Sequence, residues 1–544
     1  MTTTPSIARS SMVMAGGTIA SRILGVVRQS LIVAAIGAGL TGNAFSVANT
    51  LPNVIYMIIA GGVLNSILVP QLVRAATNPD GGRDFTDRIL TVTGLGFLVV
   101  TIVCTAGAGF LVSLYARAMQ PDALSLATLF AFLTVPQIFF YGLYAVLGQV
   151  LNARGQFAAF GWAPAAANVV QIIGLVAFIL LYQGNIDPGQ WSPAMVLLFA
   201  GTATLSIAVQ AIFLVIPLWR SGFRWTPRFG LKGVGLGQTS RVAGWAFAGL
   251  IISQLGFLIA SNIMVAAADQ GTKQHFIPGP LVYANALFVF MVPHSFVALS
   301  IITALYPRIS RAAHEGDTTL LRREYARGLT VPTALTLPAS VGLMTFAVPV
   351  TVLLFSSRDP AEIRPTAQVL AAMALGVVPF GIDVLNQRFF YAHDDGRTAF
   401  WEQLVLTGSS TTITVVTLAF RPEHTVAIIG GGIVASNVLS SLFGMVFVRR
   451  RLGHLGLREI ARTWLRIGSA SVVAAVIAWP VVLGFDGLVS GRLGAVLVLV
   501  VGGGVFGVAY LLMAWILRIR EVGELLDPIL RRLPRRGGRH DPRH

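Results

Sequence analysis

The sequence predicts an all-α membrane protein with fourteen transmembrane helices. Two features of its composition support this class: 11% of the 544 residues are charged and 55% are hydrophobic. Ordinary soluble domains carry about 25% charged residues, so a soluble fold of this size is excluded. Apolar runs of roughly 20 or more residues also recur along the whole chain, and each can cross a hydrocarbon layer of about 30 Å as a helix.

Fourteen apolar stretches are long enough to form these helices. In chain order, we predict them at residues 10–37, 43–73, 89–116, 125–151, 159–182, 193–219, 237–267, 280–306, 328–355, 365–391, 398–420, 425–448, 465–485 and 493–517. The loops between them are too short for a folded domain. The largest soluble segments are a basic connector, residues 310–327 and a basic tail.

A weak internal repeat divides the predicted helices into two lobes. PQLVRAA at 70–76 is similar to PRISRAA at 307–313, and LNARGQFAAFGWAP at 151–164 is similar in layout to RFFYAHDDGRTAFW at 388–401. The members of each pair lie six spans apart, which is typical of parallel repeats in transporters. We therefore predict an N-terminal lobe (1–219), a connector (220–236), a C-terminal lobe (237–448), two further spans (449–517) and a disordered tail (518–544).

The distribution of basic residues orients this topology. The chain has 39 Lys and Arg residues and a net charge of +17, yet the loops on one predicted side hold few of them: Arg117, Lys273, Arg358, Arg364, Arg421 and Arg492. The positive-inside rule then places both termini in the cytoplasm. The same cations lie close to the membrane, where anionic lipids explain them, so we expect no nucleic-acid partner.

Two arginines, Arg22 and Arg28, interrupt the first apolar stretch. A cation near the middle of a membrane span costs about 2.5–3.5 kcal/mol, so Arg28 is expected to face a hydrated cavity or, alternatively, a structural partner. A cavity with a fixed positive charge suits an anionic substrate. Positions six residues apart are separated by about 240° on an unbroken helix, so we expect the two side chains to share a face only if the helix deforms near Gly25.

Polar side chains in other spans are candidates for the walls of this cavity. They are Asn43, Asn49, Asn53 and Asn65 on the second span, Gln254 on the seventh and Asn285 on the eighth. Each of them also fits a role as an interhelical hydrogen-bonding group. Asp383, which we take as the one carboxylate deep inside a span, and Arg388 are candidates for an ion or proton site, with a structural pair as the alternative.

Signals for an enzyme are absent from the sequence. No His, Cys, Asp or Glu cluster has metal-ligand spacing, no Gly-rich phosphate loop follows a strand, and no paired carboxylates lie in a large loop. We therefore expect no catalytic residues, no cofactor and no metal site. Any driving force would come from an ion gradient, the membrane potential or consumption of the substrate.

Several motifs in the first spans resemble one transporter family. SRILGVVRQ at 21–29, GAGLTGNAF at 37–45, LPN at 51–53 and GGVLNSILVPQL at 61–72 resemble the N-terminal signature of the MurJ/MviN lipid II flippases, which belong to the multidrug/oligosaccharidyl-lipid/polysaccharide exporter superfamily. The resemblance covers about residues 7–450. It extends through VLNARGQFAAFGWAPAAANVVQI at 150–172, ALYPRISRAAHEGD at 304–317 and RFFYAHDDGRTAF at 388–400.

The resemblance implies a flippase in the bacterial plasma membrane. Its substrate would be the undecaprenyl-pyrophosphate-linked peptidoglycan precursor, moved to the outer leaflet by alternating access between the two lobes. Spans 13 and 14 would form a groove for the lipid tail, and Arg22 and Arg28 match the two first-span arginines of the family. Membrane lipids and other cell-wall synthesis proteins are the further partners expected.

The chain departs from the family pattern at charged positions of the cavity. Gln29 and Asn43 stand where the family usually has Asp, and uncharged residues replace family arginines and a glutamate at Tyr56, Met57, Gly61 and Phe288. The cavity would be less charged than usual. Two alternatives to a lipid II flippase therefore stay open: an exporter of another polyprenyl-linked glycan or amphiphile, and a non-transporting scaffold for cell-wall synthesis.

Overall fold

The computed structural model describes residues 7–61, 82–154, 156–182, 187–230, 241–272, 274–355, 360–485 and 491–530, and these ranges contain helices but no β-strand. Ten of the helices are long and apolar enough to cross a membrane, and two bent helix pairs raise this number to twelve. The other two predicted spans coincide with α2 (Leu40–Ile59) and α18 (Gly396–Val416). The predicted all-α membrane fold is confirmed.

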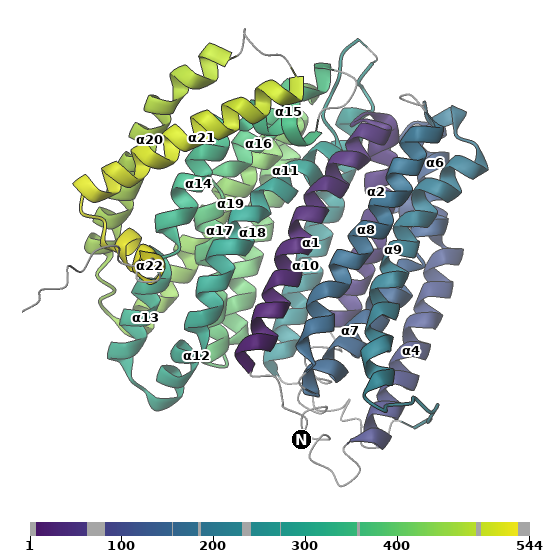
Figure 1. Cartoon of the computed structure of the whole chain (residues 1–544), viewed down its shortest axis with the longest axis horizontal. Helices are drawn as coiled ribbons and strands as arrows, with labels where there is room; N and C mark the ends of the chain where they lie inside the picture. The colour runs from purple at the N-terminus through teal and green to yellow at the C-terminus, as the bar shows by residue number, and fades with distance from the viewer. Residues whose placement is uncertain are drawn as a thin grey trace, which may run out of the picture.

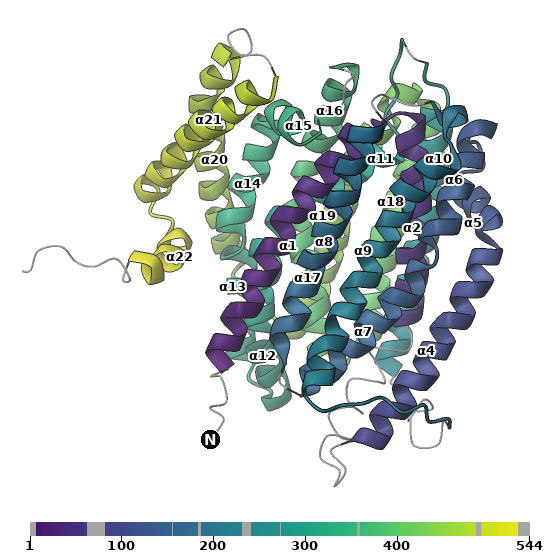
Figure 2. The same ribbon diagram turned by 45° about the vertical axis from the view of Figure 1, so that its right-hand side comes forward.

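The first half of the chain forms one bundle, the N-terminal lobe. Besides α2, it contains α1 (Ile7–Ile36), α4 (Arg83–Ala106), α5 (Ala108–Tyr115), α6 (Pro121–Thr134), α7 (Gln137–Ala153), α8 (Phe157–Leu181) and α9 (Pro193–Arg220). α1 packs along α8, α8 along α9, and α2 against α6. Figures 1 and 2 show α1 as a continuous helix that runs from the lower end of the bundle, near the N-terminus, to the upper end.

The second half forms the C-terminal lobe in the same way. Besides α18, it contains α10 (Arg241–Ala268), α11 (Pro280–Pro293), the π-helical turn η3 (His294–Ala298), α12 (Leu299–Glu315), α13 (Thr318–Thr330), α14 (Thr333–Thr345), α15 (Ala347–Phe355), α16 (Ile363–Ala374), α17 (Val377–Ala392) and α19 (Thr425–Leu452). α18 lies between α10 and α19, and α19 also packs against α16 and α17.

Two long helices flank the C-terminal lobe. α20 (Leu457–Phe485) and α21 (Gly491–Ile516) pack against each other, α20 also against α14 and α21 against α15. Both views place this pair on the side of the C-terminal lobe that faces away from α4 and α9 (Figures 1 and 2). Large apolar side chains on both helices are exposed, such as Leu465, Val476, Leu493 and Trp515, as expected for surfaces in contact with lipid.

Several predicted boundaries are wrong in detail. The predicted span 89–116 is divided at Gly107 into α4 and α5, and the segment 310–327, expected to be a loop, belongs to α12 and α13. The tail predicted to be disordered begins as an amphipathic helix, α22 (Arg520–Leu530). Residues 62–81, which include the first copy of the PQLVRAA repeat, lie outside the described residues.

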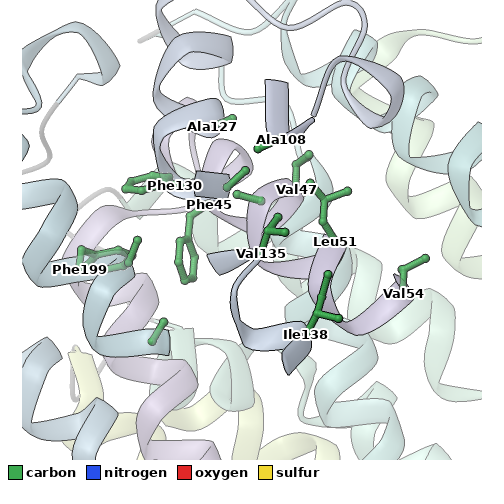
Figure 3. Close-up of a cluster of buried hydrophobic side chains, with 14 of the residues drawn as sticks. Phe45, Val47, Leu51, Val54, Ala108, Ala127, Phe130, Val135, Ile138 and Phe199 are labelled. Atoms are coloured by element: carbon green, nitrogen blue, oxygen red, sulfur yellow. The ribbon is translucent and has the colours of Figure 1, made fainter. Parts of the chain in front are cut away.

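Aromatic side chains fill the core of the N-terminal lobe (Figure 3). Phe45 of α2 meets Phe130 of α6 and Phe199 of α9, with ring centroids 5.6 and 4.8 Å away in edge-to-face arrangements. Such pairs stabilise beyond the apolar area that they bury. Val47 and Leu51 extend the same core along α2. This packing fixes α2, which carries several candidate site residues, to the rest of the lobe.

The start of the connector is bound to the lower end of α4. Asp87 accepts hydrogen bonds from the Thr226 hydroxyl (2.6 Å) and backbone N–H (3.2 Å), and Arg228 pairs with Asp84. Trp225 donates to the Thr91 hydroxyl at 3.2 Å. The connector thus moves with the N-terminal lobe as far as residue 230.

The two lobes are joined by hydrogen bonds at the upper end of the bundle. The carboxylate of Glu362 accepts from the Ala38 backbone N–H at 3.1 Å, and the Asn43 side chain accepts from the Leu281 backbone N–H at 3.1 Å. Asp269 also accepts from the backbone N–H of Gln120 at 2.9 Å. Among pairs of described residues, no hydrogen bond or ion pair joins the lobes at the lower end.

Candidate functional site

Arg28 lies in the interior of the N-terminal lobe without a carboxylate partner. Its Nη1 donates to the Gln171 side-chain oxygen of α8 at 3.4 Å, while its buried Nε has no hydrogen-bond partner. Among the described residues, no salt bridge involves Arg28. A buried cation with incomplete hydrogen bonding is costly, so the site favours an anion that can supply both charge and acceptors.

A cavity of about 540 Å³ surrounds this guanidinium. α1, α7, α8 and α9 form its walls, and one residue of the C-terminal lobe closes it. The polar residues that line it are Thr18, Ser21, Arg22, Arg28, Tyr141, Tyr144, Asn168 and Gln210, and the residue from the C-terminal lobe is Phe288 of α11. The cavity therefore combines two cations with phenol and amide groups, a set that can bind phosphate oxygens.

A close helix crossing positions the arginines. α1 meets α8 at Gly17 and Gly161, where a Cβ on Gly17 would lie 2.8 Å from the Gly161 backbone. Any side chain at Gly17 would force the helices apart. One turn further, the Asn168 amide donates to the Ser21 carbonyl at 2.9 Å. The crossing thus holds the face of α1 that carries Arg28 against Gln171.

Arg22 and Arg28 line the same cavity although α1 is unbroken. They reach it without sharing a helix face, so the expectation that they share a face only if the helix deforms near Gly25 is not contradicted. Arg22 and Arg28 lie about 120° apart around the axis of α1. Arginine side chains are long enough for both to reach a cavity of this size from either side of Gly25. Gly25 itself is part of the cavity wall.

A second cavity, of about 340 Å³, lies between the lobes. It is bounded by α2 and α5 on one side and by α10 and α11 on the other. Its polar lining has hydroxyl and amide groups but no charged side chain: Ser46, Thr50, Asn53, Tyr115, Ser253, Gln254, Ser261 and Tyr283. The candidates Asn53 and Gln254 thus lie on opposite sides of this uncharged cavity, one in each lobe.

The other amide candidates lie elsewhere. Asn43 is 3% exposed and bonds across the upper end of the lobes, and Asn285 accepts a hydrogen bond from Gln29 at 2.7 Å. Asn49 on α2 is half-buried and lines neither cavity. Asn65 lies outside the described residues. The structure thus does not assemble all the asparagines of span 2 into one polar wall.

Asp383 lies in the core of the C-terminal lobe, apart from Arg388. It is 2% exposed, and neither of its carboxylate oxygens has a hydrogen-bond partner. Arg388 instead lies over the Tyr306 ring, 5.2 Å from its centroid. Among the described residues, no salt bridge involves either of them. The expected network of Asp383 with Arg388 therefore does not form here.

A second buried carboxylate, Glu402 of α18, lies in the same core. It is fully buried and accepts from the Asn386 amide at 2.8 Å, and Asn386 accepts from the Tyr325 hydroxyl at 2.6 Å. Asp383 is therefore not the one carboxylate deep inside a span, as expected from sequence. The position of Glu402 in the predicted span 398–420 was a signal that could have identified it.

Comparison with known proteins identifies the family. A family model described as "Lipid II flippase MurJ" matches residues 32–501. The chain belongs to the lipid II flippase MurJ family. It is 26% identical over 512 residues to the probable lipid II flippase MurJ of Thermotoga maritima, covering 94% of this chain and 96% of the relative. With the lipid II flippase MurJ of Burkholderia cenocepacia it shares 25% identity over 482 residues, 87% of this chain and 89% of the relative.

Solved structures share the same fold. The structure titled "Lipid II flippase MurJ, inward closed conformation" matches with a TM-score of 0.70 at 15% identity, covering 95% of this chain and all of that chain. An inward-facing multidrug transporter of the MATE family matches with a TM-score of 0.64 at 16% identity. The match covers 80% of this chain and 95% of that transporter. This chain therefore has the same fold as both of these solved structures.

The structure places the four uncharged residues at which the sequence departs from the MurJ motifs. Phe288 occupies the edge of the Arg28 cavity, close to Gly25, and Tyr56 stacks in a tilted arrangement on Tyr141 with centroids 5.5 Å apart. Met57 lines the uncharged cavity between the lobes. A Cβ on Gly61 would lie 2.6 Å from the Leu250 side chain of α10. At these four positions, where the motif resemblance implied charged residues, this chain therefore has aromatic and apolar contacts.

Proposed function

We propose that this chain translocates the polyprenyl-diphosphate-linked peptidoglycan precursor, lipid II, across the bacterial plasma membrane. The observation that carries the proposal is the Arg28 guanidinium, which lies in a 540 Å³ cavity with no carboxylate partner among the described residues. A diphosphate supplies the charge and the acceptors that this group lacks. Membership of the MurJ family supports the same substrate class.

The division into two lobes supports transport by alternating access. The hydrogen bonds between the lobes lie at the upper end and near the middle, so a rocking motion that opens the upper end must break them. Both termini are proposed to lie in the cytoplasm, in agreement with the positive-inside rule. In that orientation the upper end faces outward, and the lower end, where no hydrogen bond joins the lobes among the described residues, faces the cytoplasm, where the precursor is made.

Asp383 and Glu402 are proposed to couple this motion to protons or a monovalent cation. Both side chains are buried in the C-terminal lobe, and Asp383 Oδ1 and Oδ2, Glu402 Oε2 and Asn437 Oδ1 have no hydrogen-bond partner. Neither carboxylate has a cationic partner among the described residues, and at this depth such groups must bind protons or a cation to remain stable. Arg388, bound to Tyr306, is proposed to have a packing role instead.

The decisive experiment is translocation of labelled lipid II by the purified chain in vesicles. Arg28→Gln should abolish most of the transport, whereas Arg28→Lys keeps the charge and should retain part of it. Arg421→Gln is the matched control, because the Arg421 side chain is 84% exposed and far from the cavity lining. Equal transport by the Arg28→Gln variant and the native chain would overturn the proposal and favour a scaffold.

The lower charge of the Arg28 cavity favours one alternative substrate, a different polyprenyl-linked glycan. Phe288 stands where family members carry an arginine, so a different polyprenyl-linked glycan could be the preferred cargo. Expression in cells depleted of their own flippase separates the two substrates. If the chain is well expressed but does not restore wall synthesis, the alternative glycan is favoured over lipid II.

A further inference from the structure

A third cavity, of about 510 Å³, lies at the upper end between the C-terminal lobe and the α20–α21 pair. α14, α15 and α16 form its inner wall, and the upper parts of α20 and α21 form its outer wall. Most of its lining is apolar, including Val348, Val352, Val482 and Val498. It is separate from the Arg28 cavity and from the uncharged cavity between the lobes, with which it shares no lining residue.

One cation, Arg364, lines this cavity. Arg364 is exposed at the start of α16 and makes no hydrogen bond or ion pair with another residue of the chain in the part that the structure describes. The Gln368 amide, one turn further along α16, and Trp479 of α20 line the same space. An unpaired guanidinium beside an amide can bind phosphate oxygens, and tryptophan is typical of the membrane interface. The cavity thus has the chemistry of a lipid-phosphate site.

An apolar groove continues from the cavity along α21. Gly494 and Val498 line the cavity, and Val501, Val505, Val508 and Leu512 line a groove of about 470 Å³ between α20 and α21. These residues recur every three or four positions, so they form one stripe on the helix. The stripe is about 27 Å long at 1.5 Å per residue. One leaflet provides only about half of the roughly 30 Å hydrocarbon core, so a chain longer than ordinary acyl chains fits the stripe best.

We infer that the Arg364 cavity is a docking site for the phosphate group of a long-chain polyprenyl lipid at the upper, outward end of the molecule. This inference rests on the proposed function, because it places the headgroup there after translocation, while the chain remains along α21. Arg28 would bind the diphosphate during crossing and Arg364 would hold it before release. The two arginines lie in separate cavities, so their contributions can be measured separately.

Binding of undecaprenyl diphosphate to the full-length purified chain tests this site by native mass spectrometry. The measurement is made in the Arg28→Gln background, in which the other cationic cavity is weakened. Adding Arg364→Gln should weaken the remaining binding by about tenfold, as expected for loss of one charge-assisted contact. Arg364→Lys should retain most of it, and Arg421→Gln, a cation of the same predicted side, should change nothing.

Two outcomes overturn the inference. Binding that is unaffected by Arg364→Gln removes the site, and equal competition by phosphatidylglycerol assigns it to ordinary phospholipid instead. Size-exclusion and thermal unfolding profiles check that each variant is folded. The proposed function is tested separately by transport in the Arg28→Gln single variant. Loss of transport there, together with no effect of Arg364→Gln on binding, refutes the docking site and leaves the flippase proposal intact.

Discussion

Gln29 of α1 donates a hydrogen bond of 2.7 Å to Asn285 of α11, joining the two lobes next to Arg28. Family members usually carry a carboxylate at position 29, and here two neutral amides make the contact. The Asn285 Nδ2 atom is buried and has no partner. The pair therefore links the lobes without placing a negative charge beside Arg28, which leaves the guanidinium free to bind an anionic substrate.

The Gln29–Asn285 contact should stabilise the closed arrangement of the lobes. Asn285→Ala removes the acceptor and leaves the Gln29 amide without this partner. Because the site is buried, with Asn285 1% exposed, the substitution should lower the free energy of unfolding by about 1–3 kcal/mol. A double-mutant cycle with Gln29→Ala isolates the pair. Additive effects of the two substitutions on unfolding in detergent would show that the contact contributes nothing.

Gln171 should act as a positioning residue for Arg28. Gln171→Leu removes the oxygen that Arg28 Nη1 contacts at 3.4 Å and should reduce the apparent affinity for lipid II by roughly tenfold, because hydrogen bonds to charged groups contribute about 1.5–3 kcal/mol. Gln171→Glu should reduce it further by neutralising the cation. Transport rates over a range of lipid II concentrations distinguish this effect from simple loss of folded protein, which lowers the maximum rate alone.

Phe288→Arg should bring the cavity closer to the family pattern. An arginine at position 288 would be a third cation in the cavity that Arg22 and Arg28 line, and its repulsion should lower the unfolding temperature of the variant without substrate. A diphosphate ligand should restore the melting temperature and bind about tenfold more tightly than to the native chain. Phe288→Leu serves as the control for lost packing. If both variants respond to the diphosphate alike, the position does not influence the anion.

Asp383→Asn should uncouple transport from the ion gradient with little loss of stability. The neutral amide has a similar shape and needs no proton or cation at this buried position. Transport in vesicles should lose its dependence on imposed pH or sodium gradients. The control is Asp394→Asn, because Asp394 is exposed and its φ of 53° suits asparagine. A gradient dependence that survives Asp383→Asn excludes this residue from coupling.

Glu362→Ala should favour opening of the upper end. The substitution removes the acceptor of the Ala38 backbone N–H, one of the bonds that join the lobes there. A cysteine at Ser253, in the cavity between the lobes, should then react faster with a reagent added from the outer side. Cys104 is first replaced by serine because it is the single native cysteine. Unchanged labelling in the Glu362→Ala variant would show that other contacts keep the end closed.

The class of fold and the position of the buried cation, Arg28, both follow from hydropathy along the chain. Apolar runs in a low-dielectric membrane can only satisfy their backbone groups as helices, so the spans were readable without any knowledge of packing. The same environment makes an arginine in the middle of a span energetically costly, so Arg28 is recognisable as a candidate site residue from the sequence alone. Hydropathy does not reveal where a helix breaks or where a polar helix lies on the surface. The break between α4 and α5 and the helix α22 in the tail were therefore not predicted.

The residues that surround Arg28 depend on how the helices pack. Spacing along one helix fixes which side chains share a face, but not which helix lies opposite, so the neighbours Gln171 and Tyr141 are identified only in the folded lobe. For the same reason, sequence spacing does not show that Arg388 lies over Tyr306, or that Asp383 lies in the core that contains Glu402. Long-range contacts depend on how helices cross, and that is set by packing at positions such as Gly17 and Gly161, where close approach leaves no room for a side chain.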